Sequence, residues 1–149
     1  MNKLLHSAVN KFNNINLMCG TFALKIEEGV LTESGITLLK KKLKKLMDNI
    51  GQNIEEGKIL MAEITVMLKD TLNCYYENES LLETIDFHAG LLESKFNKLK
   101  DDLTGGNYDI AANYLTASLR IIGEKALACG IVLNELKCAL EKSGKYRQR

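Results

Sequence analysis

The chain has 149 residues, of which 46% are hydrophobic and 26% charged, a composition typical of one folded globular domain and unlike that of a disordered chain. Twenty basic and 19 acidic residues give a formal net charge of +1, so no overall field directs the protein to nucleic acid or to an anionic membrane. Proline is absent, and apolar residues recur three and four positions apart along nearly the whole chain. This pattern predicts a few long helices joined by short turns.

The first apolar pattern predicts a helix over about residues 2–30. A turn at 32–35 should follow it, where Thr32 or Ser34 can cap the next helix. The residues that define the pattern share one helix face: Leu5, Ala8, Phe12, Ile15, Cys19, Phe22, Ile26 and Val30.

The second pattern predicts helices over about 33–50 and 54–76. Gly51 and Gly57 lie where the two halves meet, and each glycine costs roughly 1 kcal/mol in a helix interior relative to alanine. We therefore expect a kink or a short break there, with one continuous helix as the alternative.

A polar connection is expected at residues 76–80. Ser80 and Glu83 have the spacing of a capping box, which predicts that the next helix begins after Ser80 and covers about 81–103. The paired glycines at 105–106 should end that helix, because two adjacent glycines strongly disfavour helical backbone.

The last helix is predicted over about 108–141, and the basic residues 142–149 should form a frayed tail. Gly123 and Gly130 lie inside this helix, where they should allow a neighbouring helix to approach closely. Short turns make sequential helices antiparallel neighbours. We therefore predict one all-α domain over residues 1–149, an elongated antiparallel bundle of four to five long helices.

The N-terminal stretch lacks the apolar run of a signal peptide, because polar residues interrupt it. No segment approaches the ~18 apolar residues that a membrane-spanning helix needs. We expect a cytoplasmic protein, with export without a cleaved signal peptide as an alternative. The cysteines are far apart and mostly within apolar patterns, so we interpret them as reduced core thiols: Cys19, Cys74, Cys129 and Cys138.

The two histidines give no sign of metal chemistry. A ferritin-like di-iron site requires glutamate three residues before histidine, but Lys3 precedes His6 and Ile85 precedes His88 at that spacing. No glycine-rich phosphate loop is present either. The sequence therefore predicts no catalytic residue, no metal site and no cofactor, and we interpret the protein as non-enzymatic.

Residues 38–47 combine five lysines with an apolar helix face. Such a segment can bind an acidic partner or lie on an anionic membrane, and Lys41, Lys42 and Lys45 are the candidate contacts. The alternative is a solvated face whose leucines belong to the core, because the apolar pattern continues well beyond the lysines.

Part of the segment 113–130 resembles the BH3 motif, by which apoptosis regulators dock into the groove of Bcl-2-type proteins. The resemblance is carried by Leu115, Leu119, Arg120, Ile122, Gly123 and Glu124. It implies that Leu119 enters a partner groove, that Gly123 allows close approach, and that Glu124 pairs with an arginine of the partner. The same apolar positions also fit the core face of the helix, which is the alternative.

The sequence thus favours a non-enzymatic helical interaction protein, such as an adaptor, a secretion chaperone or an effector-like regulator. It would bind a protein partner through a bundle groove or a helix face, and self-association stays open. Apolar residues that flank the core faces, such as Leu38, Leu91 and Ile121, point to an exposed apolar strip. The alternative is a membrane-surface or membrane-active protein that uses segment 38–47, and a BH3-like helix in 113–130 is a lesser one. No nucleic-acid partner is expected.

Overall fold

The computed structural model describes residues 1–29, 36–70, 72–104 and 112–143, with their side chains except at 36–39, 72 and 73. These residues form four α-helices and no strand, which confirms the all-α prediction. The helices are α1 (Asn2–Glu27), α2 (Ile36–Lys69), α3 (Leu72–Thr104) and α4 (Ala112–Ser143). At 1.5 Å of rise per residue, α2 is about 50 Å long.

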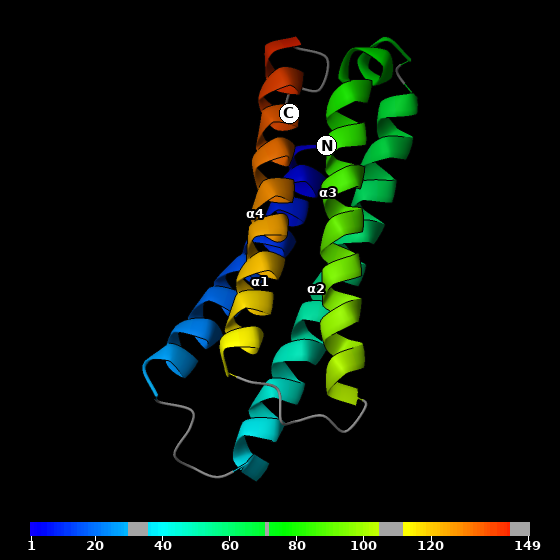
Figure 1. Cartoon of the computed structure of the whole chain (residues 1–149). Coiled ribbons are helices and arrows are strands. Elements are labelled where there is room, and N and C mark those ends of the chain that lie inside the picture. The colour runs from blue at the N-terminus through cyan, green and yellow to red at the C-terminus, as the bar shows by residue number, and fades with distance from the viewer. Residues whose placement is uncertain (30–35, 71, 105–111, 144–149) are drawn as a thin grey trace.

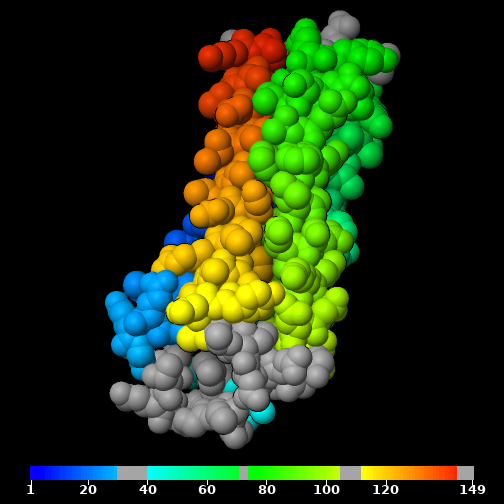
Figure 2. Space-filling model, viewed as in Figure 1, coloured from blue at the N-terminus to red at the C-terminus, as the bar shows by residue number. Residues whose placement is uncertain are grey.

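The helices run alternately down and up in an elongated bundle, so each is antiparallel to the next (Figure 1). Each helix packs against its neighbours in the chain, and α4 closes the bundle by packing against α1. The α1–α4 pair has the most extensive contact and the α2–α3 pair the least. Figure 2 shows the face that α3 and α4 cover together, with the end of α1 beside the start of α4.

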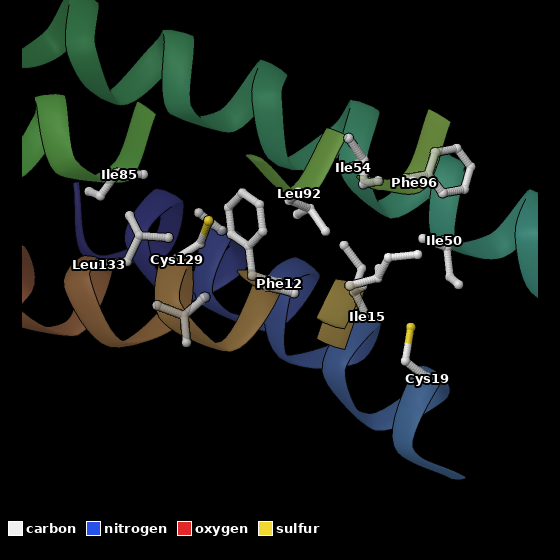
Figure 3. Packing of buried hydrophobic residues seen from close by; sticks show 14 of the residues in the cluster. Phe12, Ile15, Cys19, Ile50, Ile54, Ile85, Leu92, Phe96, Cys129 and Leu133 are labelled. Carbon is white, nitrogen blue, oxygen red and sulfur yellow. The ribbon is translucent and has the colours of Figure 1, made fainter. Parts of the chain in front are cut away.

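The apolar rows of all four helices meet in one core. Figure 3 shows side chains from each helix directed into the shared interior, with Phe12 of α1 among them. The two central aromatic rings contact glycines of α2: Phe12 lies against Gly57, and Phe96 of α3 lies against Gly51. Because burying a large apolar side chain contributes roughly 1.5–3 kcal/mol, this core is the main source of stability.

The expected break at Gly51–Gly57 is absent, because α2 continues from Ile36 to Lys69 without interruption. A Cβ atom at Gly51 would lie 3.2 Å from Phe96 Cζ, and one at Gly57 would lie 3.0 Å from Phe12 Cζ. The glycines therefore make room for two rings of the core. Their packing outweighs the helix propensity that these positions lose.

The polar connection predicted at 76–80 was wrong, because these residues lie inside α3, which begins at Leu72. Two polar side chains in and just after this stretch, Asn78 and Thr84, bond to the carbonyl oxygen four residues before them, so the helix itself satisfies these donors. Asn78, although buried, donates its Nδ2 to the carbonyl oxygen of Cys74 at 2.8 Å. Thr84 donates its hydroxyl to the carbonyl oxygen of Ser80 at 2.8 Å, so Ser80 is a mid-helix residue and not a cap.

The first helix ends at Glu27, three residues before its predicted end. Gly29 has a φ of 76°, which is typical of the glycine that follows a helix, and its N–H bonds to the Ile26 carbonyl oxygen at 3.0 Å. The last helix ends at Ser143, two residues beyond the prediction. The predicted features at 30–35, 105–111 and 144–149 lie outside the described residues. They are two turns, the predicted starts of the helices at 33 and 108, and most of the basic tail.

In the described part of the chain, ion pairs join α1 to α4, α1 to α2 and α2 to α3. Arg120 of α4 holds both carboxylate oxygens of Glu27 of α1, with N–O distances of 3.1 and 2.8 Å. The other two pairs are Lys11–Glu56 between α1 and α2 and Lys58–Glu93 between α2 and α3. Within the described ranges, no helix has an apolar stretch long enough to cross a membrane.

Candidate interaction groove

A groove of about 420 Å³ lies between α1 and α2, and we call it the α1–α2 groove. It follows the outer edge of the helix pair, next to the core. From α1 it is lined by Leu17, Met18, Thr21, Phe22 and Lys25, and from α2 by Lys42, Lys45, Leu46 and Asn49. Steps of three and four residues separate most of these positions on each helix, so each set lies on one flank of its helix.

The floor of the groove is apolar. Leu46 is buried, Met18 and Phe22 are half-buried, and Leu17 is 64% exposed. Leu17 lies beside the core row of α1 and not in it, which explains why an apolar residue remains at the surface. The floor therefore offers apolar surface that the bundle itself does not cover.

Three exposed lysines border the floor. Lys25 extends from α1, and Lys42 and Lys45 extend from α2. Because α1 and α2 are antiparallel, Lys25 near the end of α1 lies at the same end of the groove as Lys42 near the start of α2. The groove thus has a cationic end and an apolar end.

The charges of these lysines are not neutralised within the described part of the chain, where none of the three has an ion pair. None of the described residues that line the groove is acidic. Two carboxylates on its helices pair elsewhere, since Glu27 binds Arg120 and Glu56 binds Lys11. Among the described residues, therefore, no carboxylate pairs with these lysines, and their ammonium groups can bind an external anion.

The structure separates the three lysines that the sequence grouped together. Lys42 and Lys45 line the groove, while Lys41 is exposed on α2 outside its lining. Sequence reasoning missed Leu17 and Phe22 as lining residues, together with the rest of the α1 wall. Leu17 gave a weak signal, because it is apolar but falls outside the repeating core pattern.

The other candidate residues lie on α4. Leu119 is fully buried and Gly123 is also buried, whereas Glu124 is exposed. The Gly123 carbonyl oxygen accepts a hydrogen bond of 2.9 Å from Nδ2 of Asn16 in α1. A Cβ atom at Gly123 would lie 3.4 Å from the Cys19 Cβ, so this glycine does allow α1 to approach closely. The BH3-like positions therefore divide between the bundle interior and the surface.

The second groove region lies between α2 and α3 and has a different character. One part, of about 310 Å³, includes the acidic residues Asp48, Glu55 and Glu93 together with Lys100. A neighbouring part of about 500 Å³ has Phe12 in its lining, and there burial raises the pKa of Asp86 above its usual value. The Lys58–Glu93 ion pair, at 3.0 Å, crosses between the two helices. This side of α2 is acidic where the α1–α2 groove is basic.

The remaining reactive side chains do not gather into a site. Among the described residues, no group of three or more histidine, cysteine or acidic residues is placed to hold a metal ion. His88 is half-buried beside Phe87, and its Nδ1 has no hydrogen-bond partner in the described structure. Burial raises the pKa of the Cys19 and Cys129 thiols to about 12, so both are un-ionised at neutral pH.

Comparison with known proteins identifies no relative. No protein-family model, no curated protein and no solved structure matches the chain. The α1–α2 groove, with its apolar floor and three lysines, is therefore the feature of the molecule that bears on function.

Proposed function

We propose that the protein is a non-enzymatic helical interaction protein that binds a protein partner in the α1–α2 groove. It would act as an adaptor, a secretion chaperone or an effector-like regulator. The observation that carries this proposal is the exposed apolar floor around Leu17, bordered by three lysines that have no ion pair in the described structure. Apolar floors with charged borders are typical of surfaces that receive a partner helix.

The energetics support a partner that covers this floor. Burying a leucine or phenylalanine side chain fully contributes roughly 1.5–3 kcal/mol, and Leu17 and Phe22 both retain exposed surface. The lysines add less affinity, because an exposed ion pair contributes about 0.2–1 kcal/mol. Their main effect would be on the choice of partner and on the association rate.

The membrane-surface alternative has less support from the packing. In the part of segment 38–47 whose side chains the structure describes, residues 40–47, the apolar residues Leu43, Leu46 and Met47 are all buried in the bundle. A membrane could therefore receive the lysines but not this apolar face unless the bundle opened. The BH3-like alternative meets the same difficulty, since Leu119 is fully buried against the other helices.

A photo-crosslinking experiment tests the proposal. A photoreactive amino acid is placed at Thr21, which is exposed and lines the groove, and at Ile59, which is exposed on α2 outside the groove. In an extract of the organism that encodes the chain, we expect a protein adduct from the Thr21 position and none from Ile59.

Leu17→Glu provides a variant that should lose partner binding without losing stability. Leu17 is largely exposed, so the substitution should leave the melting temperature unchanged. It should remove the Thr21 adduct by placing a charge on the apolar floor. Equal crosslinking from Thr21 and Ile59, or no adduct from either position, would contradict a partner site in this groove.

A further inference from the structure

We infer that the occupant of the α1–α2 groove is an acidic amphipathic helix, whose carboxylates meet Lys25, Lys42 and Lys45 while its apolar stripe covers Leu17 and Phe22. This inference depends on the proposed function and specifies the chemistry of the partner. It follows from three properties of the groove, which are its charge, its helical walls and its dimensions.

The charge of the groove selects an anionic partner. Three ammonium groups border it, none of its lining residues is acidic, and none of the three lysines has an ion pair in the described structure. A partner with carboxylates would neutralise these lysines, whereas a basic partner would be repelled. The α2–α3 side would disfavour the same acidic partner, because its lining has three carboxylates, of Asp48, Glu55 and Glu93, against the ammonium groups of Lys100 and of Lys58, which pairs with Glu93. The two flanks of α2 thus differ in the charge of the ligand they favour.

The walls of the groove select a helical partner over an extended one. Both walls are α-helices, whose backbone N–H and C=O groups are bonded within the helix. An extended peptide would find no backbone partners there, and its own polar backbone groups would lie unpaired over the apolar floor. A partner helix satisfies its own backbone and presents only side chains.

The dimensions fit a short helix. From Leu17 to Lys25 the groove follows nine residues of α1, whose eight steps of 1.5 Å span about 12 Å or roughly two helical turns. Lys42 and Lys45 are three residues apart on α2 and so lie on the same flank one turn apart. Acidic residues three or four positions apart on a partner helix can therefore face both lysines at once.

Two matched peptides test this inference by NMR. The acidic probe is a synthetic amphipathic helix of about four turns, with a leucine stripe flanked by glutamates. The neutral probe replaces every glutamate by glutamine. Titrated into the isotope-labelled full chain, the acidic probe should shift the amide signals of residues 17–25 and 42–49. It should bind about tenfold more tightly than the neutral probe, because it alone forms ion pairs at the cationic end.

Two charge-reversed variants provide the matched control. Lys42→Glu with Lys45→Glu changes two lysines that line the groove, whereas Lys41→Glu with Lys44→Glu changes two exposed lysines of the same helix that do not. Both variants change the net charge equally. The first should weaken binding of the acidic probe about tenfold, and the second should change it less than about twofold.

The possible results separate this inference from its alternatives. If both variants weaken binding of the acidic probe equally, the effect comes from overall charge and not from the groove. If the neutral probe binds as tightly as the acidic probe, the lysines do not contribute to binding. Failure of the acidic probe to shift the groove signals would also overturn the inference. Vesicles of phosphatidylcholine and phosphatidylserine serve as a membrane probe. If the protein co-sediments with these vesicles and the Lys42→Glu, Lys45→Glu variant does not, the lysines bind a membrane surface instead.

The fate of the Thr21 adduct distinguishes this inference from the proposed function. The Thr21 adduct can persist in the Lys42→Glu, Lys45→Glu variant while the acidic probe binds weakly. This result would support a protein-binding groove but reject an acidic partner. If the Thr21 adduct is lost in the Lys42→Glu, Lys45→Glu variant and retained in the Lys41→Glu, Lys44→Glu variant, the result supports both the protein-binding groove and the acidic partner.

Discussion

The ring of Phe12 in α1 lies directly against the backbone of Gly57 in α2, where a Cβ atom would be only 3.0 Å from Phe12 Cζ. Phe12 is almost fully buried, and its ring occupies the space that a side chain at position 57 would fill. A glycine in the middle of a long helix thus makes room for a ring of the neighbouring helix. The same relationship holds between Gly51 and the ring of Phe96.

This contact predicts opposite effects of alanine at two helix-interior glycines. Gly57→Ala should destabilise the protein by about 1–3 kcal/mol, because the added methyl group collides with the Phe12 ring. Gly20→Ala should stabilise it by up to about 1 kcal/mol, because a Cβ atom there meets open space and alanine favours the helix. Denaturant unfolding of both variants measures the difference. Equal stabilisation by the two substitutions would show that Phe12 does not need the space at Gly57.

The sequence predicts those parts of the fold that follow from the spacing of apolar residues along each helix. The three-and-four spacing located the core faces of all four helices, because a helix in a bundle must bury one stripe. It failed where a tertiary contact outweighs a local signal. The glycines of α2 looked like a break but accommodate aromatic rings. The polar residues 76–80 looked like a loop but lie inside α3, where Asn78 is buried and bonds to the turn before it.

The groove could be predicted only in part, because a groove belongs to two helices. The lysines of α2 were visible as a cluster, and two of them, Lys42 and Lys45, line the groove. Their counterpart Lys25 and the apolar wall at Met18 and Phe22 lie on α1. Nothing in the spacing along one helix shows which flank will face a neighbour. That information comes from how the bundle is packed.

The cysteines should differ sharply in reactivity. Cys138 is exposed, so its interpretation as a core thiol was wrong, whereas the other three cysteines are buried as expected. Burial raises the pKa of Cys19 and Cys129 to about 12. At pH 8 a thiol with that pKa is ionised in about one molecule in ten thousand, and the thiolate is the reactive form. We expect one thiol to react rapidly with a disulfide reagent in the native protein and all four to react in denaturant.

Cys138→Ser is the matched control for this measurement. It should abolish the rapid phase and leave three thiols that react only after unfolding, with little change in stability because the side chain is exposed. A rapid phase that remains in this variant would show that a buried cysteine becomes accessible in the native protein.

The Lys11–Glu56 pair should contribute stability that depends on pH. The hydrogen bond from Lys11, followed by the one from Gln52, lowers the pKa of Glu56 below its usual value. The folded state therefore favours the charged carboxylate, and its contribution is present above the ordinary glutamate pKa and is lost as the pH falls through the lower folded value. Glu56→Gln should reduce the melting temperature slightly at pH 7 and have no effect well below pH 4.

Glu63→Gln is a suitable control, because Glu63 is exposed on the same helix and has no ion pair in the described structure. It should change the melting temperature less than Glu56→Gln at pH 7. If the two variants behave alike at every pH, the Lys11–Glu56 pair contributes nothing to stability in solution.

The final prediction decides whether the BH3-like positions on α4 are core or recognition surface. Leu119 is fully buried, and Ile121, two residues away on the same helix, is 38% exposed. Leu119→Glu should destabilise the protein by several kcal/mol, because it places a carboxylate among packed side chains with no partner. Ile121→Glu should cost less than about 1 kcal/mol, since its charge can reach water. Thermal melting of both variants gives the comparison directly. If the Leu119→Glu protein melts like the parent, then Leu119 is accessible in solution, and a peptide of residues 113–130 should be tested against a Bcl-2-type groove.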